Sequence, residues 1–156
     1  MLKVISGGQT GADEGALAGA VAAGFSTGGT APKYYKTENG PNLNLATYGL
    51  VESDFGNYKE RTWLNVENSD LTIWIGTQDS AGFFCTKNAT MYHKKPLLGV
   101  SKNWEYSEVE ELVTMIKDLR VSVVNFAGNR ESKNPGIFLS TKNLVILLGK
   151  KLNVKD

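Results

Sequence analysis

Short apolar runs alternate with longer alanine-rich or amphipathic stretches along the chain. The short aliphatic and β-branched runs predict buried strands, and the longer stretches predict helices that open with polar residues or close at glycine. We expect strands over residues 2–5, 71–75, 96–100 and 121–126, and a short one within 25–32 that ends at Gly28-Gly29. We expect helices over residues 14–23, 58–68, 83–93, 107–119 and 136–151, although the run 144–148 also fits a strand.

This alternation predicts an α/β fold with a mostly parallel sheet and helices on both faces. The 156 residues form one domain, 1–156, long enough to bury a sizeable core. Ligands bind such sheets at the carboxyl ends of the strands. The candidate site is therefore expected at three loops, residues 6–13, 76–82 and 127–136.

Residues 33–57 show neither helical nor strand periodicity and are rich in Tyr, Asn, Gly and Pro. We interpret them as a long loop insertion, and such loops inside compact domains are usually functional. Lys33, beside two tyrosines, is a candidate for covering an anionic or planar ligand. A solvated excursion or a contact between subunits explains the segment equally well.

The first loop carries three glycines between a predicted strand and a predicted helix. A strand-to-helix turn of this kind lets the backbone approach a ligand and points free helix N–H groups at an anion. The spacing fits neither a P-loop nor a dinucleotide fingerprint. A side chain at Gly8 is expected to occupy the phosphate position. The structural alternative is a capped helix, with Thr10 as N-cap and Asp13 completing a capping-box-like pair.

Charge and composition exclude several classes of function. The formal net charge of +1 argues against a nucleic-acid partner. No apolar run approaches the length of a membrane span, and no signal pattern opens the chain, so we expect a cytoplasmic protein. The single cysteine, Cys85, agrees with a reducing compartment. The single histidine, His93, leaves no His/Cys set for zinc, and we expect no directly coordinated metal.

Two polar groups have both a functional and a structural interpretation. Arg61 can give a charge-assisted bond to an anion, or form a surface ion pair with a neighbouring glutamate. In the Arg130-Glu131-Ser132 run, Arg130 can bind an anion while Glu131 holds the arginine in position. The alternative is a local Arg–Glu pair with Ser132 capping the last helix.

Four motifs resemble those of the molybdenum cofactor carrier family, in the expected order and over most of the chain. They are Ser6-Gly7-Gly8-Gln9-Thr10-Gly11-Ala12-Asp13, then Arg61-Thr62 with Asn65-Val66 and Ser69-Asp70, then Ser80-x-Gly82 with Thr86, and finally Asn125-x-Ala127-Gly128-x-Arg130-Glu131-Ser132-x-x-Pro135-Gly136. The resemblance implies a Rossmann-like fold, in the wider group that includes lonely-guy-type phosphoribohydrolases. It also implies binding of molybdenum cofactor, a pterin that bears a phosphate, by a homo-oligomer such as a dimer or tetramer.

The resemblance assigns roles to the matching residues. The first loop would cradle the phosphate while Gln9 bonds the phosphate or a ring edge, and residues 80–86 would form a second polar lobe. Phe83 stands where the family is expected to have threonine, which suits a stacked base or pterin. The candidate ligand-binding residues are Gly7, Gly8, Gln9, Thr10, Gly11, Asp13, Lys33, Arg61, Asn65, Ser80, Gly82, Phe83, Thr86, Arg130, Glu131 and Ser132.

Three functions remain open at this point. The first is non-catalytic binding of a phosphorylated nucleotide-like or pterin molecule. The second is a sensor or sink for a nucleotide-derived signal, where binding itself is the output. The third is a hydrolase of an N-glycosidic or phosphoester bond with Asp13 or Glu131 as acid/base, although the sequence suggests no complete catalytic set.

Overall fold

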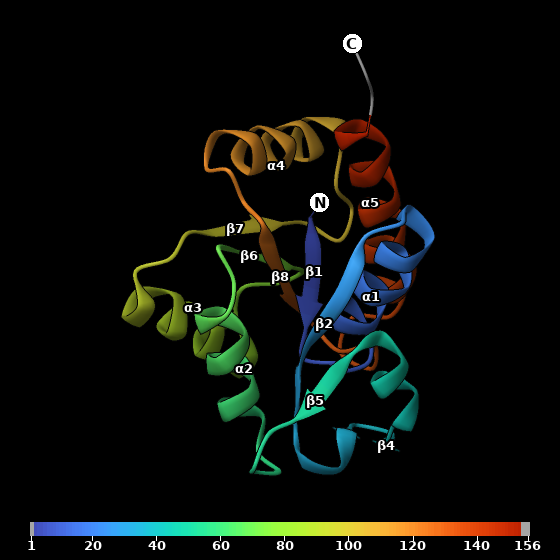
Figure 1. Ribbon diagram of the computed structural model, residues 1–156, viewed down its shortest axis with the longest axis vertical. Helices are drawn as coiled ribbons and strands as arrows, with labels where there is room; N and C mark the ends of the chain where they lie inside the picture. The colour runs from blue at the N-terminus through green and yellow to red at the C-terminus, as the bar shows by residue number, and fades with distance from the viewer. Residues whose placement is uncertain (1, 154–156) are drawn as a thin grey trace.

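The structure, a computed structural model, describes residues 2–153 and is built on one six-stranded sheet (Figure 1). Every pair of neighbouring strands in this sheet is parallel. The strand order is β5 (Leu50–Glu52), β2 (Ser26–Ala31), β1 (Lys3–Ser6), β8 (Val123–Gly128), β6 (Leu71–Ile75) and β7 (Leu97–Val100).

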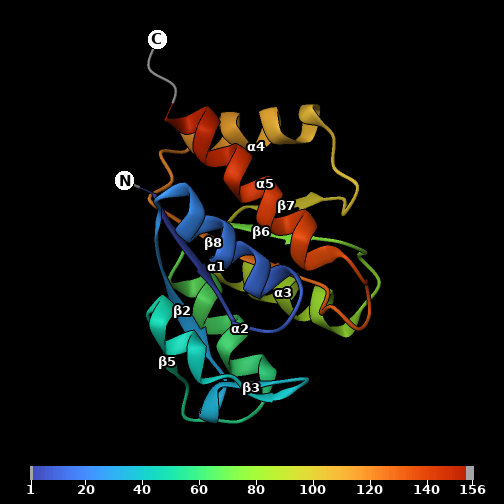
Figure 2. The same cartoon turned by 90° about the vertical axis from the view of Figure 1, so that its right-hand side faces the viewer.

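Helices cover both faces of the sheet. Figures 1 and 2 show α1 (Ala12–Ala23), α4 (Tyr106–Asp118) and α5 (Ile137–Leu152) on one side. The other side carries α2 (Tyr58–Glu67) and α3 (Ala81–His93). The expected α/β, Rossmann-like architecture in a single domain is therefore confirmed. Residues 144–148 are helical, as part of α5. Within residues 2–153, no helix is long and apolar enough to cross a membrane.

The main core lies between the sheet and the helices α1, α4 and α5. Leu71, Ile73 and Ile75 of β6 are fully buried in it, whereas Trp74 of the same strand packs edge-to-face on Phe83 of α3. Both faces of a central parallel strand are covered, so its sequence is apolar apart from Thr72, whose hydroxyl accepts from the buried Asn125 amide. This explains why β6 is evident from sequence alone.

The small residues of α1 serve a contact that the sequence did not specify. A Cβ at Gly15 would lie 2.4 Å from the carbonyl oxygen of Phe138, and one at Gly19 would lie 2.6 Å from that of Lys142. The missing side chains therefore let α5 lie directly against α1, which fixes the start of α5 beside the first loop.

Residues 33–57 contain regular structure, so their interpretation as one long loop is wrong. They form the 3-10 helices η1 (Lys33–Tyr35) and η2 (Leu43–Tyr48), the hairpin β3 (Lys36–Thr37) and β4 (Gly40–Pro41), and the edge strand β5. Leu45 and Leu50 bury themselves with Leu17 and Ala31 in a second small core. The sequence did not reveal these elements because two apolar anchors among polar residues give no periodicity. The strand β5 is moreover stabilised by pairing with β2, which lies far from it in the sequence. The strand β2 also continues through Gly28-Gly29 to Ala31.

Candidate functional site

A cavity of about 740 Å³ opens at the carboxyl ends of β6 and β8, and α2 and α3 form its sides. Its volume lies within the range of small-molecule sites. Its walls come from the first loop, from the start of α2, from the loop and first turn of α3, and from the loop after β8. Four basic side chains line it, namely Lys59, Arg61, Arg130 and Lys133, and two acidic ones, Asp13 and Asp79.

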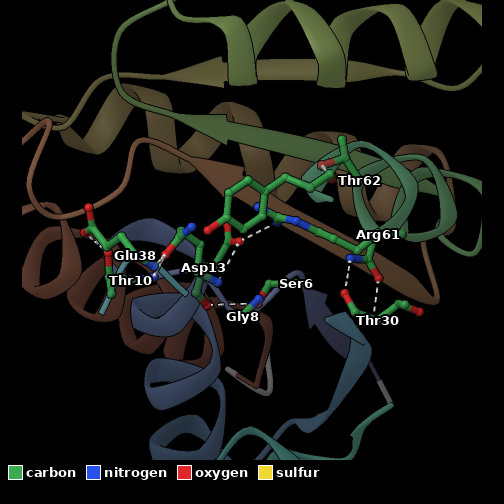
Figure 3. A network of polar contacts seen from close by, with 11 residues as sticks. Ser6, Gly8, Thr10, Asp13, Thr30, Glu38, Arg61 and Thr62 are labelled. Carbon is green, nitrogen blue, oxygen red and sulfur yellow. Dashed lines mark hydrogen bonds and ion pairs between the residues drawn. The ribbon is translucent and has the colours of Figure 1, made fainter. Parts of the chain in front are cut away.

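A buried ion pair joins the first loop to α2 (Figure 3). Arg61 Nη1 lies 2.8 Å from Asp13 Oδ2, and the two side chains are 12% and 3% exposed. Gly7 makes room for this arginine, because a Cβ there would lie 1.8 Å from Nη1. Burial raises the pKa of Asp13, while the charge of Arg61 and backbone N–H groups of the loop oppose that rise. Arg61 is therefore paired within the site and does not form the expected surface pair.

The N–H groups of the first loop are largely bonded to the protein itself. Asp13 Oδ2 accepts from the N–H of Gln9 at 3.1 Å, and Gln9 Oε1 accepts from that of Thr10 at 3.0 Å. The Ala12 N–H donates to the carbonyl of Asn129 at 3.2 Å. The N-cap of α1 is Gly11 without a side-chain cap, so the capping-box interpretation of Thr10 and Asp13 is wrong.

The glycines of this loop face protein and not the cavity. Gly8 has φ +78°, and a Cβ there would lie 2.6 Å from Leu45 and 3.0 Å from Leu50. A Cβ at Gly11 would meet the backbone of Asn129 at 2.5 Å. The expectation that a side chain at Gly8 would occupy a phosphate position is therefore wrong, because Gly8 points into the small core below the loop.

Glu38, which sequence reasoning missed, connects the first loop to the loop after β8. The hydroxyls of Thr10 and Ser132 donate to its carboxylate, and the Ser132 N–H adds a bond of 3.3 Å. Figure 3 shows the Thr10 and Glu38 side chains together at one side of the network. Desolvation raises the pKa of Glu38, but these hydrogen bonds and the charge of Arg130 outweigh it, so the net shift is downward.

The three residues Arg130, Glu131 and Ser132 have separate roles, which differ from both the functional and the structural interpretation of this run. Glu131 caps α5, with its carboxylate accepting from the N–H groups of Gly136 at 2.7 Å and Phe138 at 2.9 Å. Ser132 binds Glu38 and does not cap the helix. Arg130 lines the cavity, with its guanidinium 5.6 Å from the centre of the Tyr58 ring.

The start of α3 forms the opposite wall and is more open. Ser80 is the N-cap and accepts from the Phe83 N–H at 3.1 Å, and its carbonyl accepts from Phe84 at 3.2 Å. Within residues 2–153, the N–H groups of Ala81 and Gly82 have no acceptor, and both residues line the cavity. A helix start with two free N–H groups favours an anion.

Seven of the sixteen candidate residues line this cavity, and the others lie behind or beside it. Asn65 bonds both backbone groups of Thr30 at 2.8 and 2.9 Å, which fastens α2 to β2. Lys33 is exposed beside Tyr34, and Phe83 is buried against Trp74. The lining candidates are Gln9, Asp13, Arg61, Ser80, Gly82, Thr86 and Arg130.

Sequence reasoning missed several cavity residues. Tyr58 precedes Arg61 by one helical turn, a spacing that places both on one face and could have revealed it. Trp74 is 2% exposed and borders the cavity, with Nε1 donating to the Thr77 carbonyl at 2.9 Å. The local pattern marked neither Lys59 nor Cys85. Four further lining residues lie in motifs or loops expected at the site but were not singled out, namely Thr62, Thr77, Asp79 and Lys133.

Residues 2–153 contain no group of three His, Cys, Asp or Glu side chains placed to hold a metal ion.

Comparisons with known proteins agree with this fold. The chain matches a solved crystal structure described as a "putative molybdenum carrier protein" from Syntrophus aciditrophicus SB, with 33% identity and a TM-score of 0.82. The match covers 95% of this chain and 94% of that one, and it confirms the resemblance inferred from the motifs. No curated protein matches the chain. The family model that matches, over residues 4–148, describes circularly permutated YpsA proteins of the SLOG group. The chain therefore belongs to the circularly permutated YpsA SLOG family.

Proposed function

We propose that the protein binds a phosphorylated nucleotide-like or pterin molecule in the cavity and does not transform it. The observation that carries this proposal is the start of α3, where two residues whose N–H groups have no acceptor in residues 2–153 line a cavity that Lys59, Arg130 and Lys133 also line. The helix dipole and three cations together favour a multiply charged anion. We place the phosphate there, and no longer at the glycines of the first loop.

The rest of the cavity suits a planar ring. The Tyr58 ring lies near two guanidinium groups, with Arg61 at 5.4 Å and Arg130 at 5.6 Å from its centre. An aromatic side chain held in this way offers a flat surface for a heterocycle. Trp74 supplies a second aromatic border. The cavity is therefore matched to a ligand that has an anionic end and an aromatic end.

The molybdenum carrier description of the Syntrophus protein makes molybdenum cofactor, a phosphorylated pterin, our first candidate. The cofactor would be cargo, held by its pterin and phosphate. A nucleotide-derived signal molecule shares this chemistry and is the second candidate. Mass spectrometry of the molecule released from gently purified, oxygen-free protein separates the two. Assembly into a homo-oligomer is also part of the proposal, and exposed Phe84, Met91 and Tyr92 on α3 offer an apolar surface for it.

The hydrogen bonding of Asp13 and Glu131, the two candidate acid/base residues, favours binding without turnover over hydrolysis. Asp13 Oδ2 is held by Arg61 and by the Gln9 N–H, and both oxygens of Glu131 accept backbone bonds of α5. A general acid or base must reach the proton that it transfers. Groups engaged in this way are suited to a structural task, so the bound molecule should be recovered intact after incubation.

Gly82→Asp tests the phosphate position with inorganic diphosphate as the probe. A Cβ at Gly82 meets only Trp74 at 3.6 Å and Ser80 at 3.8 Å, so the variant should fold normally. Its carboxylate would occupy the helix start and repel the anion, and calorimetric titration should show at least about tenfold weaker binding. The matched control Gly82→Ala should stay within about threefold of the original affinity, since it adds no charge. Equal affinity of the Asp variant and the parent protein would place the phosphate elsewhere.

A further inference from the structure

Two buried donors at the cavity have no acceptor within residues 2–153. Gln9 is 5% exposed and lines the cavity, yet its Nε2 finds no acceptor within residues 2–153. An unsatisfied buried donor is unfavourable, and native proteins rarely keep one without a reason. Arg61 Nε, in the same wall, is also buried without an acceptor in that part of the chain.

The orientation of the Gln9 amide follows from its surroundings. Its Oε1 accepts from the N–H groups of Thr10 at 3.0 Å and Glu38 at 2.8 Å. Rotating the amide by half a turn would set its NH₂ group against these two donors, so only one orientation is compatible with the backbone. Glu38 is held in turn by Thr10 and Ser132, which fixes this arrangement. The protein therefore keeps the amide as a donor.

The neighbouring carboxylate leaves both donors of this wall unsatisfied. Asp13 Oδ2 accepts from the Gln9 N–H at 3.1 Å and from Arg61 Nη1 at 2.8 Å, and neither of these bonds uses Gln9 Nε2 or Arg61 Nε. The wall formed by Gln9 and Arg61 thus has two donors to satisfy. An acceptor on the ligand would relieve at least one of them, whereas an N–H of the ligand would relieve neither.

We propose that Gln9 is a specificity-determining residue, which donates from Nε2 to a carbonyl oxygen on the ligand's ring and disfavours an amino group there. This inference rests on the proposed function, because it assumes that a phosphorylated heterocycle occupies the cavity. It adds the chemical class of that heterocycle: an oxo-substituted ring is bound in preference to its amino-substituted counterpart. The recognition acts through hydrogen bonding, so its effect is selectivity between ligands of equal charge and size.

Inosine monophosphate and adenosine monophosphate are suitable probes, because they differ at one edge of the purine, where the first has a carbonyl oxygen beside a ring N–H and the second an amino group beside an unprotonated ring nitrogen. Titration calorimetry on the full chain should show the inosine nucleotide binding about tenfold or more tightly. In Gln9→Glu, one carboxylate oxygen can keep both backbone bonds while the other accepts, so the preference should disappear or reverse. Gln78→Glu, the same change in an exposed loop residue beside the cavity, should leave the ratio unchanged.

Thermal unfolding of each variant shows whether it folds. If Gln9→Glu does not fold, Gln9→Met supplies the same test, since it removes the donor without adding a charge and should bring the ratio close to one. Equal affinities for the two nucleotides, or a ratio that both Gln9 variants leave unchanged, would overturn the inference. Binding of inorganic diphosphate without binding of either nucleotide would overturn it and leave the phosphate position intact. If diphosphate also fails to bind, the proposed function falls with it.

Discussion

The loops that precede α1 and α3 both start a helix at the same edge of the sheet, but they treat their N–H groups differently. At the start of α1, the N–H groups of Gln9, Thr10 and Ala12 are bonded to side chains or carbonyls of the protein. Those of Gly11 and Asp13 have no acceptor in residues 2–153, and of these two residues only Asp13 lines the cavity. At the start of α3, the N–H groups of both Ala81 and Gly82 have no acceptor in the described chain, and both residues line the cavity. The glycine-rich loop is therefore the more closed of the two.

The difference arises from what each glycine provides. Gly7 makes room for the Arg61 guanidinium, and Gly8 turns the backbone above Leu45 and Leu50. The carboxylate of Asp13 then fills the place beside the loop N–H groups that an external anion would take. Glycine enrichment in a strand-to-helix turn therefore indicates close packing, and the partner in that packing can be another part of the same chain.

The largest effect that separates the two loops should come from Arg61→Met. Loss of its partner leaves Asp13 as a buried unpaired carboxylate, and removing one member of a buried pair typically destabilises by about 3–5 kcal/mol. Urea denaturation measures the change. Gly82→Ala, in the open loop, serves as the control and should leave the unfolding free energy nearly unchanged. A small loss in Arg61→Met would show that the ion pair does not hold the first loop closed.

The same variant gives a pH dependence with a definite sign. Burial already raises the pKa of Asp13, and removing the opposing charge of Arg61 raises it further. Stability that depends on a raised pKa is fully present below the pKa of the unfolded chain and is lost as pH rises through the folded value. The loss of unfolding free energy in Arg61→Met should therefore be small in acid and grow as the pH rises to neutrality. A deficit that is independent of pH would point to lost packing instead.

Gly8→Val should have the second-largest effect, and it should act on stability and not specifically on binding. Positive φ costs a branched residue roughly 1–2 kcal/mol, and the overlap with Leu45 and Leu50 adds about 1–3 kcal/mol. Gly24→Val isolates the backbone part, because φ is +84° there and no atom lies within 4 Å of its Cβ. Thermal unfolding compares the two variants. A folded, stable Gly8→Val protein that has lost diphosphate binding would restore the phosphate to the first loop.

Glu131→Gln should have the smallest effect of the three. It weakens the cap of α5 by removing the charge that accepts from Gly136 and Phe138, and a lost cap interaction typically costs about 1 kcal/mol. Urea denaturation measures this loss, and the affinity for inorganic diphosphate should change by less than about twofold. A large loss of affinity with unchanged stability would instead give Glu131 a direct role in holding the ligand.

Local pattern predicted much of the fold and part of the site. The apolar strands, the five α-helices and the loops around the cavity followed from periodicity and from the known position of ligands on parallel sheets. It failed at residues 33–57, where Leu45 and Leu50 provide too few anchors to give a period. It also failed for Asn65, whose buried amide bonds to Thr30 are formed across 35 residues of sequence.

The sequence by itself determined that this is an α/β chain of one domain, which family it resembles, and that its polar residues converge at one edge of the sheet. Those features depend on residues near one another along the chain. Only the tertiary structure decided which N–H groups remain free, because Asp13 and Arg61 are 48 positions apart and Glu38 and Ser132 are 94 positions apart. The anion site is defined by the donors left unpaired after such long-range bonds have formed.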